Sequence, residues 1–193
     1  CKEKNILLIV DESFVDFADK EKKYTLLTND ILKSNPHLVV IKSISKSYGI
    51  PGLRLGVLAT SNTRIYAKVK QELSIWNINS MAEYFMQIFP LFEKEYQISC
   101  ERIAENRIDL IKQLKEISYI ENVYPSQANY ILCRLDEKMV VGDLVGYLLE
   151  AHQIFIKDLS GKRGFTSNQF IRLAVRNKEE NVRLIKGLHE YSI

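Results

Sequence analysis

A lysine preceded by two hydroxyl side chains and followed by an arginine is the group of residues best suited to chemistry in this sequence. Ser43 and Ser45 come just before Lys46, and Arg54 follows within the same segment, Ser43–Gly56. Hydroxyls and a guanidinium bind a phosphate dianion through charge-assisted hydrogen bonds, and glycines let the backbone turn tightly around it. A lysine beside a bound phosphorylated aldehyde can form a Schiff base. Taken alone, a Ser-Lys pair in a loop is usually a solvated turn, and that alternative stays open here.

A carboxylate stands at the end of the first apolar run of the chain. Asp11 follows the run Asn5–Val10 and begins the segment Asp11–Phe14. An anion held against the ring nitrogen of an aromatic cofactor keeps that nitrogen protonated and makes the ring an electron sink. The alternative is that Asp11 only caps the helix that follows, which is a common use of aspartate after a strand.

An arginine near the C-terminus lies inside an otherwise apolar stretch. Arg172 belongs to the segment Phe170–Arg176 and has Ile171 and Leu173 as neighbours, so in a strand its side chain points to the face opposite theirs. A buried arginine is costly unless it meets an anion, and its planar fork suits a carboxylate. We therefore expect Arg172 to bind an anionic ligand, unless it forms an ion pair with an acid on the closing helix.

The composition excludes several classes of protein. The 193 residues include 27 Lys plus Arg and 24 Asp plus Glu, a formal net charge of +3, so a nucleic-acid partner is not expected. The apolar runs are far shorter than the ~20 residues of a membrane span. The three cysteines and three histidines have no paired spacing, so neither a disulfide framework nor a metal site is predicted. We expect a protein of the reducing cytoplasm.

The first third of the chain has the pattern of an α/β sheet. Continuous apolar runs at Asn5–Val10 and His37–Ile41 predict strands that are covered on both faces, and Leu53–Thr60 is a third candidate. The amphipathic stretch Leu26–Lys33 is the expected crossover helix of a right-handed βαβ unit. Ligands of open α/β sheets bind beyond the carboxyl ends of the strands, so the polar residues that follow the first two strands should share one crevice.

The remaining two thirds change from helical to mixed patterning. Helical periodicity extends over Thr63–Ile117. After it, the expected strands and helices are Asn129–Leu135, Val140–His152, Ile154–Asp158, Gln169–Val175 and Lys178–Tyr191. Short strands and helices of this kind form an α+β layer. We therefore predict two domains, residues 1–92 and residues 93–193.

Four motifs in this order resemble a known enzyme family. They are Val10-Asp-Glu-Ser-Phe14, Ser43–Gly56, Pro125-Ser-Gln-Ala-Asn-Tyr130, and Ile171–Arg176 followed by Glu179-Glu-Asn181. Together they resemble the class I/II (fold type I) pyridoxal-phosphate aminotransferases, in the branch of histidinol-phosphate aminotransferase and threonine-phosphate decarboxylase. The resemblance covers essentially the whole chain. It implies the C-terminal part of a large cofactor-binding α/β domain, with a mostly parallel sheet and helices, followed by a small α+β domain.

The resemblance also implies roles for individual residues. Lys46 would be the catalytic residue and would hold pyridoxal 5'-phosphate covalently. The residues implied to bind the cofactor are Asp11, Ser43, Ser45, Lys46 and Arg54. The residues implied to bind the substrate are Arg172, Lys157 and Asn129. The partners implied are a small amino donor, a 2-oxo acid acceptor and a second copy of the subunit in a homodimer.

The chain departs from the family pattern in three ways. Phe14 stands where aminotransferases of this branch commonly have a tyrosine that hydrogen-bonds the cofactor, and the decarboxylating relatives tolerate phenylalanine there. Lys157 stands where a further arginine is common, and it offers a point charge in place of a fork. The phosphate loop, the stacking aromatic and the asparagine that precede the aspartate in the family have no counterpart in this chain. We therefore expect the C-terminal half or more of a subunit, with an incomplete site.

Three hypotheses on function follow from these residues. The leading one is transfer of the amino group of a small amino acid or amino-phosphate compound to a 2-oxo acid. The alternative is decarboxylation of an amino-acid phosphate such as threonine phosphate, which would use the same residues. The third is a folded fragment that binds no cofactor, and the isolated chain is expected to be inactive.

Overall fold

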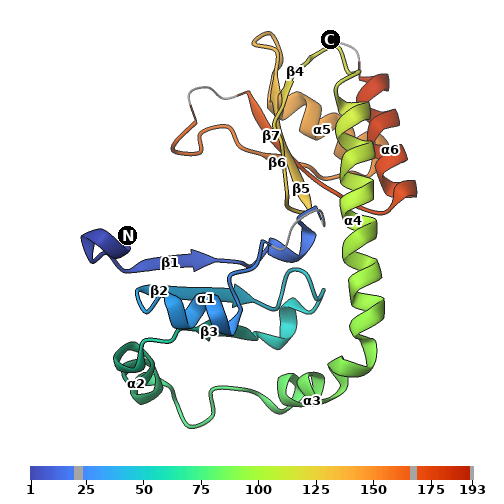
Figure 1. Cartoon of the computed structure of the whole chain (residues 1–193). Coiled ribbons are helices and arrows are strands. Elements are labelled where there is room, and N and C mark those ends of the chain that lie inside the picture. The colour runs from blue at the N-terminus through green and yellow to red at the C-terminus, as the bar shows by residue number, and fades with distance from the viewer. Residues whose placement is uncertain (20–23, 166–168, 192–193) are drawn as a thin grey trace. The chain divides into compact units, whose positions relative to one another are not determined.

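The computed structural model describes residues 1–19, 24–165 and 169–191. The chain forms two compact units, residues 1–100 and residues 101–193 (Figure 1). They divide within the long helix α4, Glu93–Leu114, and the predicted domain boundary between residues 92 and 93 is at the start of this helix. Within the described ranges, no helix is both long enough and apolar enough to cross a membrane.

The first unit contains a sheet with the order β1-β2-β3. Its strands are β1 Leu8–Asp11, β2 Leu38–Ser43 and β3 Gly56–Ala59. β1 and β2 are parallel, as predicted, and Asp11 lies opposite Ile41. β3 is antiparallel to β2, with Ser43 opposite Gly56. The predicted strand Leu53–Thr60 is shorter in the structure because Pro51–Leu53 forms a 3-10 helix.

The helices of the first unit begin at side-chain caps. They are α1 Asn29–Ser34, α2 Thr63–Glu72 and α3 Ser80–Ile88, with short 3-10 helices at Lys2–Lys4, Val15–Phe17, Pro51–Leu53 and Phe89–Phe92. Thr28, Asn62 and Asn79 each accept a backbone N–H from the first turn of α1, α2 and α3 respectively. α1 is the predicted crossover helix and ends just before Pro36, which the helix cannot continue through.

The second unit contains a fully antiparallel sheet with the order β4-β5-β7-β6. Its elements are β4 Ile120–Val123, β5 Tyr130–Leu135, α5 Val141–His152, β6 Lys157–Asp158, β7 Phe170–Ala174 and α6 Lys178–Glu190. All except β4 were predicted. β4 was not predicted, because Glu121 and Asn122 interrupt its apolar residues.

One face of this second sheet forms the main apolar core. Along β5, buried residues alternate with half-buried ones, and along β7 the exposed Arg172 lies between the buried Ile171 and Leu173. The inward side chains pack with buried residues of α4, α5 and α6 such as Leu110, Leu144 and Leu188. Figure 1 shows these helices on the same side of the sheet. The opposite face is left for polar and aromatic side chains.

Candidate active site

Asp11 is held in its ionised form at the end of β1. Its Oδ1 accepts the Ser13 backbone N–H at 2.8 Å and the Ser13 hydroxyl at 2.5 Å. These hydrogen bonds, the hydroxyl first, lower the pKa of Asp11 below its ordinary value of 3.8. Ser13 Oγ also accepts the Ser43 N–H at 2.9 Å, which connects the ends of β1 and β2. The helix-cap alternative for Asp11 is wrong, since the following 3-10 helix has Phe14 at its N-cap and no side-chain cap.

The segment that carries Lys46 leaves the sheet at the carboxyl end of β2. Ser43 is half-buried, Ser45 is buried and Lys46 is exposed. The Ser45 N–H donates to Ser43 Oγ at 3.3 Å at the start of the turn that follows β2. The turn closes at Gly49, whose φ of 68° is in the left-handed region that favours glycine. The lysine side chain is thus presented to solvent by a tightly turned loop.

Arg54 lies near Ser43 and Ser45, at the end of the loop that contains Lys46. Its backbone is in the left-handed region, with φ 53°, and its Nη1 donates to the Pro51 carbonyl at 3.2 Å. A hollow of about 450 Å³ has Asp11, Ser43, Ser45 and Arg54 in its lining, together with residues of β2 and β3. The structure therefore brings together four of the five predicted cofactor-binding residues. Lys46 follows Ser45 directly but is not among the lining residues.

The chemistry of this hollow fits the cofactor that the resemblance implies. Pyridoxal phosphate needs a carboxylate for its protonated ring nitrogen, and Asp11 is an ionised carboxylate. It also needs donors for a phosphate dianion, and the hydroxyls of Ser43 and Ser45 and the guanidinium of Arg54 lie around the same space. The lysine required for covalent attachment is adjacent in the chain. The residues present therefore match the two polar ends of this cofactor.

Two further carboxylates, which were not predicted from the sequence, hold the segments around this hollow together. The buried Glu12 accepts the Thr25 hydroxyl at 2.6 Å and the Leu26 N–H at 2.5 Å, and so ties the segment after β1 to the approach to α1. Asp16 binds Lys42 and the Ser47 hydroxyl. Both acids lie in or beside the motif that begins at Asp11, but the motif alone does not reveal partners so distant in sequence.

Arg172 is exposed on the outer face of the second sheet, so the expectation of a buried arginine is wrong. β7 packs against the core helices through Ile171 and Leu173, and Arg172 points to the opposite face. Its guanidinium lies over the Tyr130 ring at 5.1 Å from the centroid. The alternative of an ion pair with the closing helix is not observed for it in the described part of the chain. Arg176 makes that contact instead, to Glu180 at 2.9 Å.

Lys157 lies directly opposite Arg172 where β6 pairs with β7. Directly opposed residues of antiparallel strands project to the same face, so two cations are neighbours there. Lys157 is exposed, and no carboxylate of the described residues forms an ion pair with it. Asn129 immediately precedes β5 and is half-buried, and its carbonyl accepts the Val175 N–H at 2.9 Å. Two of the three predicted substrate-binding residues therefore lie on one sheet, and Asn129 directly precedes one of its strands.

Comparisons with known proteins match almost the whole chain. The family described as aminotransferase class I and II matches residues 1–188. L-serine phosphate decarboxylase of Sulfurospirillum multivorans is 32% identical over 94% of this chain and 46% of its own length. Threonine-phosphate decarboxylase of Salmonella typhimurium is 32% identical over 97% of this chain and 49% of its own length.

A solved structure shows the same architecture. The histidinol-phosphate aminotransferase of Clostridium acetobutylicum superimposes with a TM-score of 0.85 and 29% identity, over 96% of this chain and 54% of that chain. The chain spans about half the length of the relatives that it matches.

Proposed function

Since this chain belongs to the aminotransferase class I and II family, we propose that the intact protein is a pyridoxal-phosphate enzyme acting on a small amino compound that carries a phosphate. Pyridoxal phosphate is the cofactor of this family. The observation that carries the proposed substrate class is the opposition of Lys157 and Arg172 on an open sheet face. Like charges directly opposite one another destabilise a sheet, and a doubly anionic ligand removes that cost.

The residues of the first unit divide the work of holding and activating the cofactor. When bound, pyridoxal phosphate supplies an electron sink for the charge that develops at the α-carbon of the substrate. Asp11 holds the proton at the ring nitrogen, because its carboxylate stays ionised. Ser43, Ser45 and Arg54, which line the same hollow, would bind the phosphate. Lys46 would be the residue that holds the cofactor covalently, and its Nζ would carry the proton to or from the α-carbon of the substrate.

The residues of the second unit bind the two anionic groups of the substrate. The fork of Arg172 takes the α-carboxylate, and its contact with Tyr130 fixes the plane of the guanidinium. Lys157 takes the phosphate as a point charge. Asn129 orients the polar groups between them. A substrate with a carboxylate and a phosphate a few bonds apart satisfies both cations at once.

We favour decarboxylation over transamination for the reaction. In decarboxylation the bond between the α-carbon and the carboxylate would break, carbon dioxide would leave, the bonding electron pair would stay with the α-carbon, and Lys46 Nζ would supply the proton that replaces the carboxylate. Phe14 cannot donate a hydrogen bond to the cofactor, which is the departure that the decarboxylating relatives tolerate. Amino transfer, the leading hypothesis from the sequence, is the second candidate. It is supported by the likeness to histidinol-phosphate aminotransferase.

The choice is tested with substrates that differ in their carboxylate. O-phospho-L-serine and O-phospho-L-threonine can lose carbon dioxide, whereas histidinol phosphate has no carboxylate and can only be transaminated. We expect carbon dioxide release from a phosphoamino acid by the intact protein with pyridoxal phosphate. Amino transfer from histidinol phosphate to a 2-oxo acid would support the second candidate instead. Failure of every phosphorylated amine, with activity on unphosphorylated ones, would reject the substrate class.

Two lysine variants provide the control for this assay. Lys46→Ala should abolish turnover while leaving the fold intact, because an exposed lysine contributes little to packing. Lys33→Ala removes another exposed lysine, at the end of α1, and should leave turnover unchanged. Normal turnover of Lys46→Ala would refute the role of Lys46.

We also propose that the intact protein is a homodimer, because two-fold symmetry is the most common form of closure and the family resemblance implies sites at a subunit boundary. Light scattering of the intact protein measures this directly. A monomer at assay concentration would contradict the proposal.

A further inference from the structure

A sheltered ion pair lies beside the segment that carries Lys46. Asp16, in the 3-10 helix Val15–Phe17, accepts Lys42 Nζ through Oδ1 at 2.6 Å. Its other oxygen, Oδ2, accepts the Ser47 hydroxyl at 2.8 Å. The side chains of Lys42 and Asp16 are only 11% and 19% exposed. Both oxygens of one carboxylate are thus engaged, by donors from the two sides of Lys46.

These two bonds hold the ends of a short stretch of backbone. Lys42 is on β2, and Ser47 directly follows Lys46. The β2 ladder ends at Ser43, and beyond it the backbone bonds are the Ile44 N–H to Leu55 at 3.0 Å and a long turn bond of 3.4 Å from Gly49 to Lys46. The hydrogen bond from Ser47 to the Asp16 carboxylate is therefore the main contact that holds the backbone on the C-terminal side of Lys46.

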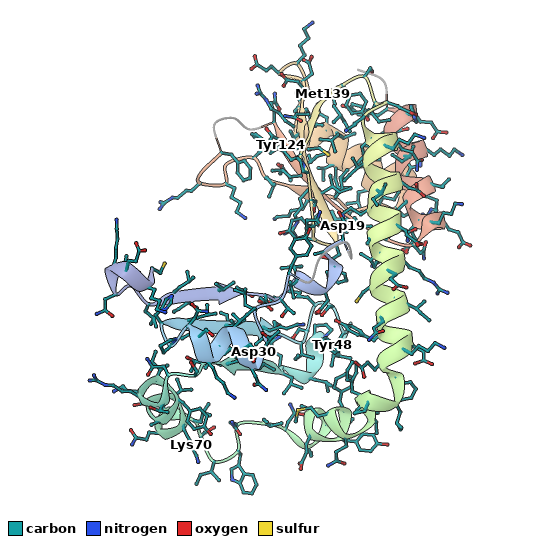
Figure 2. All side chains as sticks on the ribbon, viewed as in Figure 1. Asp19, Asp30, Tyr48, Lys70, Tyr124 and Met139 are labelled. Carbon is teal, nitrogen blue, oxygen red and sulfur yellow. The ribbon has the colours of Figure 1, made fainter. Side chains whose placement is uncertain are left out.

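An aromatic cluster covers this ion pair. The Tyr48 ring, labelled in Figure 2, has its centroid 5.9 Å from Lys42 Nζ and stacks on Tyr96 with the centroids 4.3 Å apart. Phe89 packs against Tyr48 at 4.9 Å. Burial raises the pKa of Tyr48, so its hydroxyl remains neutral at physiological pH. Charges sheltered from water interact more strongly than exposed ones, so the tie is stiff.

We infer that Asp16 is a positioning residue: through Lys42 and Ser47 it fixes the turn that presents Lys46, so that Nζ reaches the aldehyde carbon of the cofactor. The inference rests on the proposed function. Asp16 and Ser47 are not among the residues around the hollow that contains Asp11 and Arg54, although Lys42 is, so the loss of the Asp16 carboxylate should leave Asp11, Ser43, Ser45 and Arg54 in place. A displacement of a reacting group by about 1 Å can lower the rate of reaction by about a hundredfold.

The test compares two forms of the cofactor on the intact protein. Pyridoxamine phosphate has an amine in place of the aldehyde, so it uses the same phosphate and ring contacts but cannot bond to Lys46. In Asp16→Asn, one carboxylate oxygen becomes an NH₂ group, which cannot accept a hydrogen bond. The variant therefore loses the hydrogen bond from either Lys42 or Ser47. We expect the Kd for pyridoxal phosphate to rise about tenfold and that for pyridoxamine phosphate to change by less than about twofold. Borohydride trapping at Lys46, located by mass spectrometry, should slow in parallel.

Two further variants separate positioning from folding. Ser47→Ala removes one tie and keeps the ion pair, so it should fold normally and show a smaller loss of the same kind. Asp30→Asn, on the exposed surface of α1 (Figure 2), is the matched control and should bind both compounds as the parent does.

Three results would overturn the inference. Equal weakening of both compounds in Asp16→Asn and Ser47→Ala would show a merely structural role. Unchanged binding of pyridoxal phosphate in both variants would show no role at all. A parent protein that cannot be trapped at Lys46 would reject the proposed function and the inference with it, and this result is seen before any substitution is made.

Discussion

The two sheets of the molecule contain similar apolar sequences but differ in how deeply these residues are buried. In the first unit, β1 and the residues before it form a continuous apolar run, yet Ile9 on this strand is 59% exposed. In the second unit, Ile171 on β7 is fully buried. Among the described residues β1 pairs with β2 alone, whereas β7 lies between β5 and β6 and packs against helices. Apolar sequence predicts a strand, but neighbours decide whether it is buried.

The contrast extends to the cores of the two units. The main cluster of buried apolar residues lies entirely within the second unit, from Leu110 to Leu188. In the first unit the buried apolar residues are concentrated on β2, at Leu38, Val39 and Val40. Stabilisation by the hydrophobic effect is proportional to the apolar area removed from water, so the second unit has the larger share. We therefore expect it to be the more stable of the two.

The largest expected difference is in the reactivity of the cysteines. Cys133 is fully buried in the second unit, and burial raises the pKa of its thiol to about 12, so it reacts only when this unit opens. Cys1 is exposed. Timed alkylation at pH 8, read by peptide mass spectrometry, should modify Cys133 more slowly than Cys1 by about a thousandfold or more. Cys100, buried in the first unit, should fall between them, and labelling of Cys133 as fast as Cys100 would contradict the comparison.

Truncation of one isoleucine in each sheet should give unequal losses of stability. Ile171→Ala leaves a cavity in a fully buried position and should lower the free energy of unfolding by about 2–5 kcal/mol. Ile9→Ala removes a side chain that is mostly in water and should cost less than about 1 kcal/mol. Urea unfolding followed by circular dichroism measures both. Similar losses in the two variants would mean that β1 is buried in solution.

A charge on the open edge strand should improve solubility without weakening the second unit. An exposed apolar edge strand is a template for pairing with other chains, and lysine blocks such pairing. We expect Ile9→Lys to raise the concentration at which light scattering detects association. Val182→Lys places the same charge on an exposed apolar position of α6 and is the matched control. An equal gain from the control would assign the effect to net charge and not to the edge.

The sequence predicted the elements of the second unit well because its patterns are regular. β5 and β7 are short, mostly apolar runs with one arginine each, and the predicted bounds of α5 and α6 differ from the observed ones by a single residue at one end each. β4 could not be predicted, since its pairing with β5 and not its own sequence makes it a strand.

The sequence predicted which polar residues surround the hollow but not what holds them. Asp11 and Ser43 are the last residues of β1 and β2, and the carboxyl ends of a parallel pair lie at the same edge of the sheet. The bond from Lys42 to Asp16 joins residues 26 positions apart, and such a pair has no signature in local spacing. The exposure of Arg172 was missed for a similar reason, because a strand sequence does not say whether a sheet is covered on one face or on both.

The smallest effect concerns the ionisation of Asp11 at the open sheet. Ser13→Ala removes the hydroxyl that contributes most to lowering the pKa of Asp11, so this pKa should rise toward 3.8, as measured by NMR titration. A depressed native pKa gives stability that is present above the unfolded value and is lost as the pH falls through the native one. The variant should therefore be less stable than the parent at neutral pH, and part of the difference should vanish in acid.

A pH-independent part of this difference remains, because Ser13 Oγ also accepts the Ser43 N–H. Asp11→Asn removes the titrating group, so adding Ser13→Ala to it should leave only that constant part. Ser34→Ala, an exposed serine at the end of α1, controls for the loss of a hydroxyl. If the pKa of Asp11 stays unchanged in Ser13→Ala, the hydroxyl is not what holds the carboxylate ionised. The contact between the ends of β1 and β2 would then be structural alone.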